Sequence, residues 1–271
     1  MNGALTAYTW ELRKLAYQKR TYLGLGAALA VPLIFVTALA LQSGSPNDVA
    51  FGKYVRESGL AIPLVLLLFS SIWLFPLVTA LVAGDIIAAE DHNGTLKMIL
   101  TRSLDRGQVF AGKLLAAITY AAMALLLMGT VAVVAGSAKS GFNGVISLSG
   151  TRVSAVHALG LVAASFAVYM IPILGVVGIG LLLSAITRNS AAAVVGTLMS
   201  ALLMQLIGIL PGLGGLEPYL LTTQFSAWQG FFRTPTDWVP IIRAVWVCAL
   251  YAGPTMLVAY LIFLRRDVAG G

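Results

Sequence analysis

Residues 155–183 read AVHALGLVAASFAVYMIPILGVVGIGLLL, an apolar stretch without a single Asp, Glu, Lys or Arg. The hydrocarbon core of a bilayer is about 30 Å thick, and a helix needs roughly 20 apolar residues to cross it. The stretch is therefore long enough to span a membrane. Over all 271 residues, 59% are hydrophobic and 10% are charged, whereas a soluble domain has roughly 45–50% apolar and about 25% charged residues. This composition excludes an ordinary water-soluble globule.

Five further runs also lack charge and are long enough to span a membrane. We predict six transmembrane helices, at Thr21–Leu41, Leu60–Val82, Leu114–Ala135, Ala155–Leu183, Ala191–Leu210 and Ala244–Leu264. The predicted fold class is an all-α integral membrane protein, in which residues 1–271 form a single transmembrane domain.

The positive charges predict the orientation of the spans, because Lys and Arg collect in cytoplasmic segments. If the N-terminus is cytoplasmic, eleven Lys and Arg residues lie in cytoplasmic segments and six in external ones. Since the number of spans is even, we expect both termini in the cytoplasm. A signal peptide cleaved after Ala38-Leu39-Ala40 is the alternative for the first run, but that run is longer than the roughly 7–15 apolar residues typical of a signal peptide.

Residues 1–20 are predicted to be an interfacial helix. Apolar residues recur at spacings of three and four between Leu5 and Leu15, whereas Glu11, Arg13 and Lys14 lie mostly off this stripe. A basic amphipathic helix of this kind suits the headgroup layer of a membrane. The alternative is a positively charged flank that only anchors the first span.

Residues 84–113 form the longest polar segment on the predicted cytoplasmic side and read GDIIAAEDHNGTLKMILTRSLDRGQVFAGK. Asn93-Gly94 is a turn dipeptide, and Leu96, Ile99 and Leu100 beyond it make one apolar helical face. A short amphipathic helix here is suited to docking a soluble partner. The alternative is an ordinary surface helix lying along the lipid.

The order of residues in this segment resembles the membrane subunit of type-2 ATP-binding cassette (ABC) exporters. That family has a Glu followed by Gly-Thr, a short helix, an Arg and then a Lys that opens the next span. The corresponding residues here are Glu90, Gly94-Thr95-Leu96, Leu100, Arg106 and Lys113. The six-span layout with both ends inside, and the amphipathic helix before the first span, are also similar to that family.

The resemblance implies that this segment contains a coupling helix, which docks into a separate ATPase subunit, and that residues 1–20 form a connecting helix beside it. The implied ATPase-coupling residues are Glu90, Asp91, Gly94, Thr95, Leu96, Arg102 and Arg106. Two ATPase subunits would carry ATP and Mg, so no cofactor is expected in this chain. A second copy, or a related permease, would complete the complex in the plasma (inner) membrane of a prokaryote.

Other residues that resemble catalytic or ligand-binding features do not indicate an enzyme. Gly107–Lys113 matches the G-x-x-x-x-G-K spacing of a phosphate-binding loop, but Leu114 stands where Ser or Thr would bind Mg²⁺. His92 and His157 have no carboxylate or cysteine at metal-ligand spacing, and Cys248 is the only cysteine. We therefore expect no catalytic residues, no metal site and no nucleic-acid partner.

Residues 211–240, between the fifth and sixth spans, are rich in glycine and aromatic residues. This composition predicts an external re-entrant or interfacial segment with aromatic side chains at headgroup depth. In the resembled family a broken helix here closes the outer end of the pathway. The candidates for the pathway or outer gate are Gln205, Glu217 and Phe225.

The function predicted from these observations is that of a permease subunit, which exports an amphipathic small molecule, drug, peptide or lipid-like substrate using ATP hydrolysed by another chain. Two alternatives stay open. One is an ATP-independent carrier or channel, although the predicted spans lack the carboxylate typical of proton-coupled carriers. The other is a membrane anchor for a soluble partner.

Overall fold

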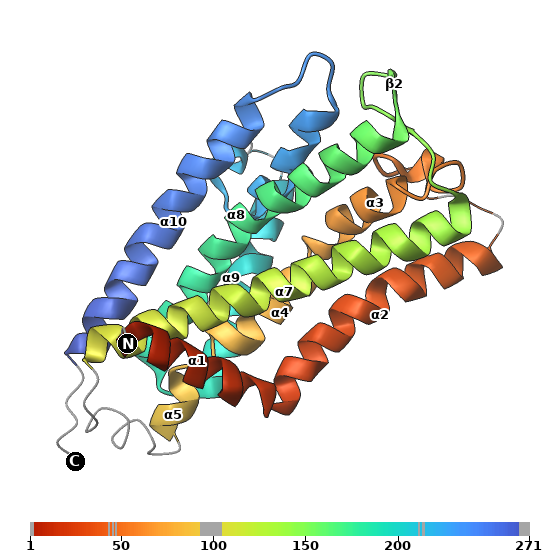
Figure 1. Ribbon diagram of the computed structural model, residues 1–271. Coiled ribbons are helices and arrows are strands. Elements are labelled where there is room, and N and C mark those ends of the chain that lie inside the picture. Colours follow the sequence, from red (N-terminus) through yellow and green to blue (C-terminus); the bar gives the residue numbers. More distant parts are fainter. Residues whose placement is uncertain are drawn as a thin grey trace.

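The computed structural model describes residues 3–42, 44, 46, 48–92, 105–210, 212 and 215–265, with the backbone alone at 91 and 92. The fold is all-α: the long helices run side by side in one bundle (Figure 1). The α-helices are α1 (Gly3–Ala16), α2 (Lys19–Leu41), α3 (Ala61–Ser70), α4 (Leu74–Ala83), α5 (Ala88–His92), α7 (Arg106–Ser140), α8 (Ala155–Thr187), α9 (Ser190–Ile209) and α10 (Val239–Leu264). Three 3-10 helices, η1 (Gly52–Tyr54), η2 (Glu217–Tyr219) and η3 (Thr222–Phe232), and two strands, β1 (Val145–Ile146) and β2 (Arg152–Val153), complete the described elements.

Five described helices are long and apolar enough to cross a membrane, namely α2, α7, α8, α9 and α10. The remaining predicted span, Leu60–Val82, corresponds to α3 and α4 together, which are bent by 61° where they meet. The start of α1, the end of α10 and α5 lie at one end of the bundle, which we call the terminal end, and β1 and β2 lie at the other, the hairpin end (Figure 1).

The second predicted span is two helices instead of one continuous helix. Pro76 is the third residue of α4, where a proline is tolerated, but its ring and missing N–H prevent α3 from continuing through it. The carbonyl groups left free at the end of α3 find other donors: the Ser71 hydroxyl donates to the Leu68 carbonyl at 2.6 Å. From α8, the Tyr169 hydroxyl donates to the Leu67 carbonyl at 3.0 Å. The break is therefore a satisfied feature of the fold.

Helix α7 is longer than the predicted span Leu114–Ala135, since it begins at Arg106 and ends at Ser140. Its first two turns therefore contain Arg106 and Lys113, which the sequence assigned to the preceding loop. A helix can carry these charges because each has a partner within the protein, as described below.

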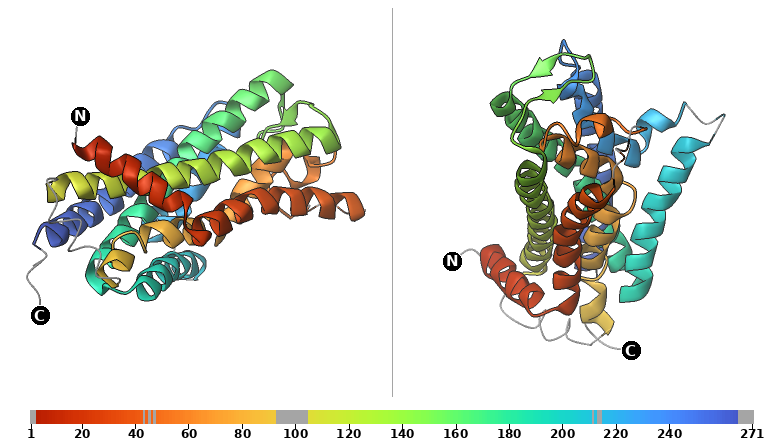
Figure 2. Two further views of the ribbon diagram at one scale, coloured as in Figure 1. Left: turned by 60° about the horizontal axis from the view of Figure 1, so that its bottom comes forward. Right: turned by 90° about the vertical axis from the view of Figure 1, so that its right-hand side faces the viewer.

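Helix α8 is the centre of the bundle. In its most apolar stretch 61% of the residues are buried, against 17% in α9 and 22% in α2 and α10. Helix α9 stands at the edge of the bundle (Figure 2, right) and exposes apolar side chains such as Val195, Met199, Leu203 and Leu206. Such a surface suits contact with lipid.

At the hairpin end, strands β1 and β2 pair antiparallel, with Val145 opposite Val153. The Leu148 amide donates to the Phe232 carbonyl at 2.8 Å, so this hairpin is joined to η3. The aromatic residues Phe225, Trp228 and Phe232 of η3 are at most 2% exposed. These three side chains fill the interior of the protein, and the headgroup depth of the segment stays a prediction.

Candidate functional site

Residues 85–90, which we call the junction segment, follow α4 directly and lead into the segment predicted to couple to an ATPase. The segment begins and ends with an acidic residue, Asp85 and Glu90, and each of these is only 2% exposed. A buried carboxylate is costly unless it is paired, so the partners of these two side chains define the local structure.

Lys113 of α7 is the central cation of the site and is fully buried. Its Nζ lies 2.8 Å from Oε1 of Glu11 and 2.6 Å from Oε2 of Glu90, and it donates to the Ile86 carbonyl at 3.1 Å. The ammonium donates hydrogen bonds to Glu11 and to the Ile86 carbonyl, and Glu90 adds a second negative charge beside it. Lys113 therefore holds α1, α7 and the junction segment together.

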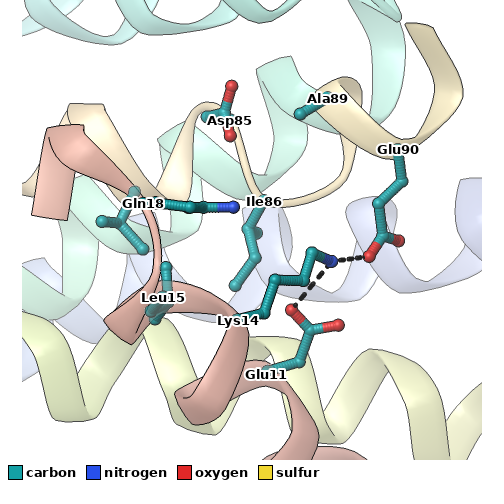
Figure 3. Close-up of a pocket in the computed structure, with 9 residues that line it drawn as sticks. Glu11, Lys14, Leu15, Gln18, Asp85, Ile86, Ala89 and Glu90 are labelled. Atoms are coloured by element: carbon teal, nitrogen blue, oxygen red, sulfur yellow. Dashed lines mark hydrogen bonds and ion pairs between the residues drawn. The ribbon is translucent and has the colours of Figure 1, made fainter. Parts of the chain in front are cut away.

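Lys14 of α1 is the second cation, and it is 38% exposed. Its ammonium forms an ion pair with Glu90 and lies 3.4 Å from Oε2 of Glu11 (Figure 3). Two carboxylates and two ammonium groups thus alternate in one compact cluster, Glu11, Lys14, Glu90 and Lys113, whose charges balance. Beside it is a pocket of about 10 Å³, which has room for roughly one water molecule.

The cluster sets the charge state of Glu90. Burial raises the pKa of this carboxyl group, but the neighbouring charges of Lys113 and Lys14 outweigh burial and bring the pKa below its ordinary value of 4.5. Glu90 is therefore ionised at neutral pH, and it interacts with both lysines as a full negative charge.

Asp85, at the start of the junction segment, has partners on two other helices. It forms an ion pair with Arg20 of α2 and accepts a hydrogen bond from the hydroxyl of Ser190, the first residue of α9. Arg20 also donates through Nε to the Gln18 side-chain carbonyl at 3.2 Å. The junction segment is thereby bonded to α2 and α9.

Ser184 of α8 is bonded to the backbone of the junction segment. Its hydroxyl oxygen accepts hydrogen bonds from the amides of Ile87 at 3.2 Å and Ala88 at 2.9 Å. Free amides at the start of a helix usually find a capping oxygen just before the helix, and here α8 supplies the oxygen for α5. Residues 85–90 are thus bonded to α1, α2, α7, α8 and α9.

Gly112 allows α1 and α7 to approach closely enough for the cluster to form. A Cβ atom at this position would lie 2.7 Å from the Cβ of Ala7 and 2.8 Å from the amide nitrogen of Tyr8. Only glycine fits this crossing, and the crossing places Lys113 against Glu11.

The residues predicted to couple to an ATPase fall into three groups. Glu90 and Arg106 have partners inside this chain: Glu90 is in the cluster, and Arg106 donates from Nη1 to the carbonyl of Leu264, in the last turn of α10, at 2.7 Å. Asp91 is in α5, with only its backbone described. The remaining predicted coupling residues, Gly94, Thr95, Leu96 and Arg102, lie outside the described residues.

The residues predicted for the interfacial helix take different positions on α1. Glu11, only 7% exposed, faces α7, whereas Arg13 is exposed. Lys14 lies between them in exposure and points towards the junction segment (Figure 3). The acidic residue of this helix therefore binds the helix to the bundle.

The three candidate pathway residues come together at one pocket near the hairpin end. Gln205 of α9, Glu217 of η2 and Phe225 of η3 all line a cavity of about 190 Å³. The end of α3 contributes Leu68 and Ser71, so the cavity reaches the break in the second span. Glu217 is exposed, Gln205 is half-buried and Phe225 is buried.

Sequence reasoning did not select Asp85, Ser184, Ser190 or Lys113 as site residues. Asp85 and Lys113 did carry a signal, because each stands directly beside an apolar span, where an unpaired charge would be costly. The two serines gave no signal, because many serines in membrane helices bond only to their own backbone.

The stretch Gly107–Lys113, which resembles a phosphate-binding loop in spacing, belongs to the first two turns of α7. Its lysine is engaged by two carboxylates and a carbonyl. Among the residues that the structure describes, no three His, Cys, Asp or Glu side chains form a group that could hold a metal ion.

The chain matches the model of a known protein family. A family model described as "ABC-2 family transporter protein" matches residues 8–204, from within α1 to within α9. The matched stretch contains the junction segment, three of the five helices bonded to it (α2, α7 and α8), and most of the other two, α1 and α9. No curated protein matches the chain.

Proposed function

The chain belongs to the ABC-2 transporter family and is a multi-pass membrane permease of an ABC transporter; from this premise we propose that it exports a substrate using ATP hydrolysed by a separate ATPase subunit. The substrate is an amphipathic small molecule, drug, peptide or lipid-like molecule. Two ATPase subunits bind a pair of permeases, either two copies of this chain or this chain and a relative, in the plasma (inner) membrane.

The observation that carries this proposal is the junction segment. It stands between the segment assigned to ATPase coupling and the membrane-spanning helices, and it is bonded to five helices. Removing one partner of a buried ion pair costs about 3–5 kcal/mol. A displaced segment therefore keeps its ion pairs and moves the helices that it is bonded to. Closure of the ATPase pair is thereby passed on to the spans.

Within this proposal the predicted coupling residues have two different roles. Asp91, Gly94, Thr95, Leu96 and Arg102 form the part that meets the ATPase. Glu90 and Arg106 act as positioning residues, because their side chains are engaged within this chain. Residues 1–20 form the connecting helix, which moves with the junction segment through Glu11 and Lys14.

The substrate pathway lies between the two permeases. The exposed apolar faces of the helices suit an amphipathic substrate, and Gln205, Glu217 and Phe225 form the outer gate near the hairpin end. Outward movement follows from alternating access, in which ATP binding closes the terminal end.

The test is purification of the tagged chain from its native membrane in mild detergent, followed by mass spectrometry and an ATPase assay. We expect a cassette ATPase in roughly stoichiometric amount, with activity that is lost when the phosphate-binding loop of that partner is mutated. A pure preparation without such an ATPase would overturn the proposal and favour an ATP-independent carrier or channel.

Reversing the charge of Glu90 is expected to disconnect the ATPase from the spans. In Glu90→Lys a third cation faces Lys14 and Lys113, so the junction segment loses its attachment to α1 and α7. We expect about tenfold less transport per ATP hydrolysed, a change of roughly 1.4 kcal/mol in coupling free energy. The measurement is transport and ATP hydrolysis by the complex in liposomes.

Two further variants make this prediction decisive. Glu57→Lys, an identical change at an exposed residue near the hairpin end, should leave the ratio of transport to hydrolysis unchanged. If Glu90→Lys does not fold, Glu90→Gln, which removes the charge at nearly constant volume, should show the same direction of change. Full coupling in a folded Glu90→Lys or Glu90→Gln complex would show that Glu90 has no coupling role.

A further inference from the structure

We propose that the cavity between α3, α9, η2 and η3 binds the ammonium head of a cationic amphiphile, with Glu217 as its counter-charge. The inference rests on the proposed function, because it names the substrate class of the pathway at its outer end. It depends on the residues that line the cavity, which nearly all lie outside the range that the family model matches or at its edge.

Two polar side chains that line the cavity, Glu217 and Gln205, are not engaged by other described residues. Glu217 is an exposed carboxylate, and among the described residues no donor bonds its side chain. The Gln205 side chain likewise has no hydrogen bond to a described residue. The described residues that line the cavity include no Lys or Arg, and Glu217 gives them a negative formal charge.

The hydroxyl groups of two serines that line the cavity already donate their protons to backbone carbonyls. The Ser71 hydroxyl donates its proton to the Leu68 carbonyl, and the Ser226 hydroxyl donates to the Thr223 carbonyl at 2.8 Å. Each hydroxyl has a single proton, so these two oxygens have only lone pairs left for a ligand. Together with the carboxylate, these oxygens give the cavity acceptor groups that attract a positively charged donor, beside the Gln205 amide, which can accept as well as donate.

The size of the cavity and the side chains around it suit a small head group with an apolar tail. A cavity of about 190 Å³ is smaller than the roughly 300–1,000 Å³ of sites that enclose a whole drug-sized ligand. It can hold a head group but not a long tail. Large apolar side chains are exposed beside it: Phe69, Ile72 and Trp73 at the break of the second span, and Leu206 and Ile209 on α9. A molecule with a small cationic head and an apolar tail fits both surfaces.

The corner formed by η2 and η3 is built firmly enough to hold Glu217 in place. The buried Gln224 amide donates to the Pro218 carbonyl at 2.8 Å and to the Leu220 carbonyl at 2.9 Å. These two bonds fix the backbone on both sides of Tyr219, beginning at Pro218, the residue that follows Glu217. The carboxylate is therefore presented by a defined turn.

The test measures binding to the purified chain in nanodiscs of neutral lipid, without ATP or ATPase. The probe is labelled hexylammonium, whose three N–H groups can donate to the lining oxygens, and only the component displaced by excess unlabelled probe is counted. Because Glu217 is exposed, we expect Glu217→Gln to weaken binding by about fivefold, near the upper limit for an exposed charge pair. Wild-type binding should also weaken as salt is raised, and the variant should lose most of this dependence.

Glu57→Gln, the same chemical change at another exposed glutamate near the hairpin end, is the matched control and should bind like the wild type. Hexyl sulfate, with the opposite charge, should not compete. Equal affinity and equal salt dependence in the wild type and Glu217→Gln would overturn the proposal, as would competition by hexyl sulfate. Because no ATPase is present, that result would leave the ATP-driven exporter standing, and failure of the exporter would leave the binding result intact.

Discussion

Replacing Lys113 with methionine is expected to lower the free energy of unfolding by about 3–5 kcal/mol, the cost of removing one partner from a buried ion pair. The change leaves the carboxylates of Glu11 and Glu90 buried beside each other, with only the partly exposed Lys14 to balance them. It also leaves the Ile86 carbonyl without its donor. The measurement is the unfolding temperature in nanodiscs, where a decrease on the order of 10 °C is expected.

The control is Lys139→Met, at the exposed far end of the same helix. This change should alter the free energy of unfolding by no more than about 0.5 kcal/mol, so the unfolding temperature should hardly move. A second comparison separates lost charge from lost packing. In the triple variant Glu11→Gln, Glu90→Gln and Lys113→Met no buried charge is left unpaired, so most of the lost stability should return. If Lys113→Met and Lys139→Met behave alike, the cluster does not hold the helices together.

Replacing Gly112 with leucine is expected to push α1 away from α7. The new Cβ would meet the backbone of Ala7 and Tyr8 at 2.8 Å, and backbone atoms cannot move aside without moving the helix. Overpacking of this kind costs about 1–3 kcal/mol, and the loss of the contact between Glu11 and Lys113 adds to it. The readouts are the unfolding temperature and the rate of trypsin cleavage after Arg13 and Lys14, which should rise as α1 detaches.

Gly253→Leu is the matched control for this prediction. Gly253 also lies within a long helix, α10, but a Cβ atom there would have nothing within 4 Å. It should leave both the unfolding temperature and the cleavage of α1 near wild-type values. Equal behaviour of the two leucine variants would contradict the tight crossing of α1 and α7.

Much of the fold follows from where charge is absent. The runs without charged residues locate the spans because a bilayer excludes unpaired charge, and the structure has a long helix, or the bent pair of α3 and α4, at each predicted position. The bend itself was missed, although Pro76 stands there, because the apolar composition is the same on both sides of it. The burial of the aromatic residues of η3 was likewise not predicted, because composition does not distinguish a side chain facing lipid from one facing protein.

Less of the candidate site could be predicted. The sequence selected Glu11, Lys14 and Glu90, but it could not show that Lys113 joins them, because Lys113 and Glu11 lie 102 positions apart. Whether two residues so far apart in the sequence form an ion pair depends on how their helices cross. Likewise, Gln205, Glu217 and Phe225 were selected singly, and only the packing of η2 and η3 against α9 shows that they share one cavity.

The central claim is that the segment following the junction segment meets an ATPase, and site-specific photo-crosslinking tests it most directly. A benzophenone amino acid replaces Leu96 in one variant and Phe142, which is 47% exposed near the hairpin end, in another. After irradiation of native membranes, we predict a covalent adduct between the chain and a cassette ATPase from position 96 and none from position 142. An ATPase adduct from position 142 would contradict the account. So would the absence of an adduct from position 96 in a preparation where the ATPase co-purifies with the chain.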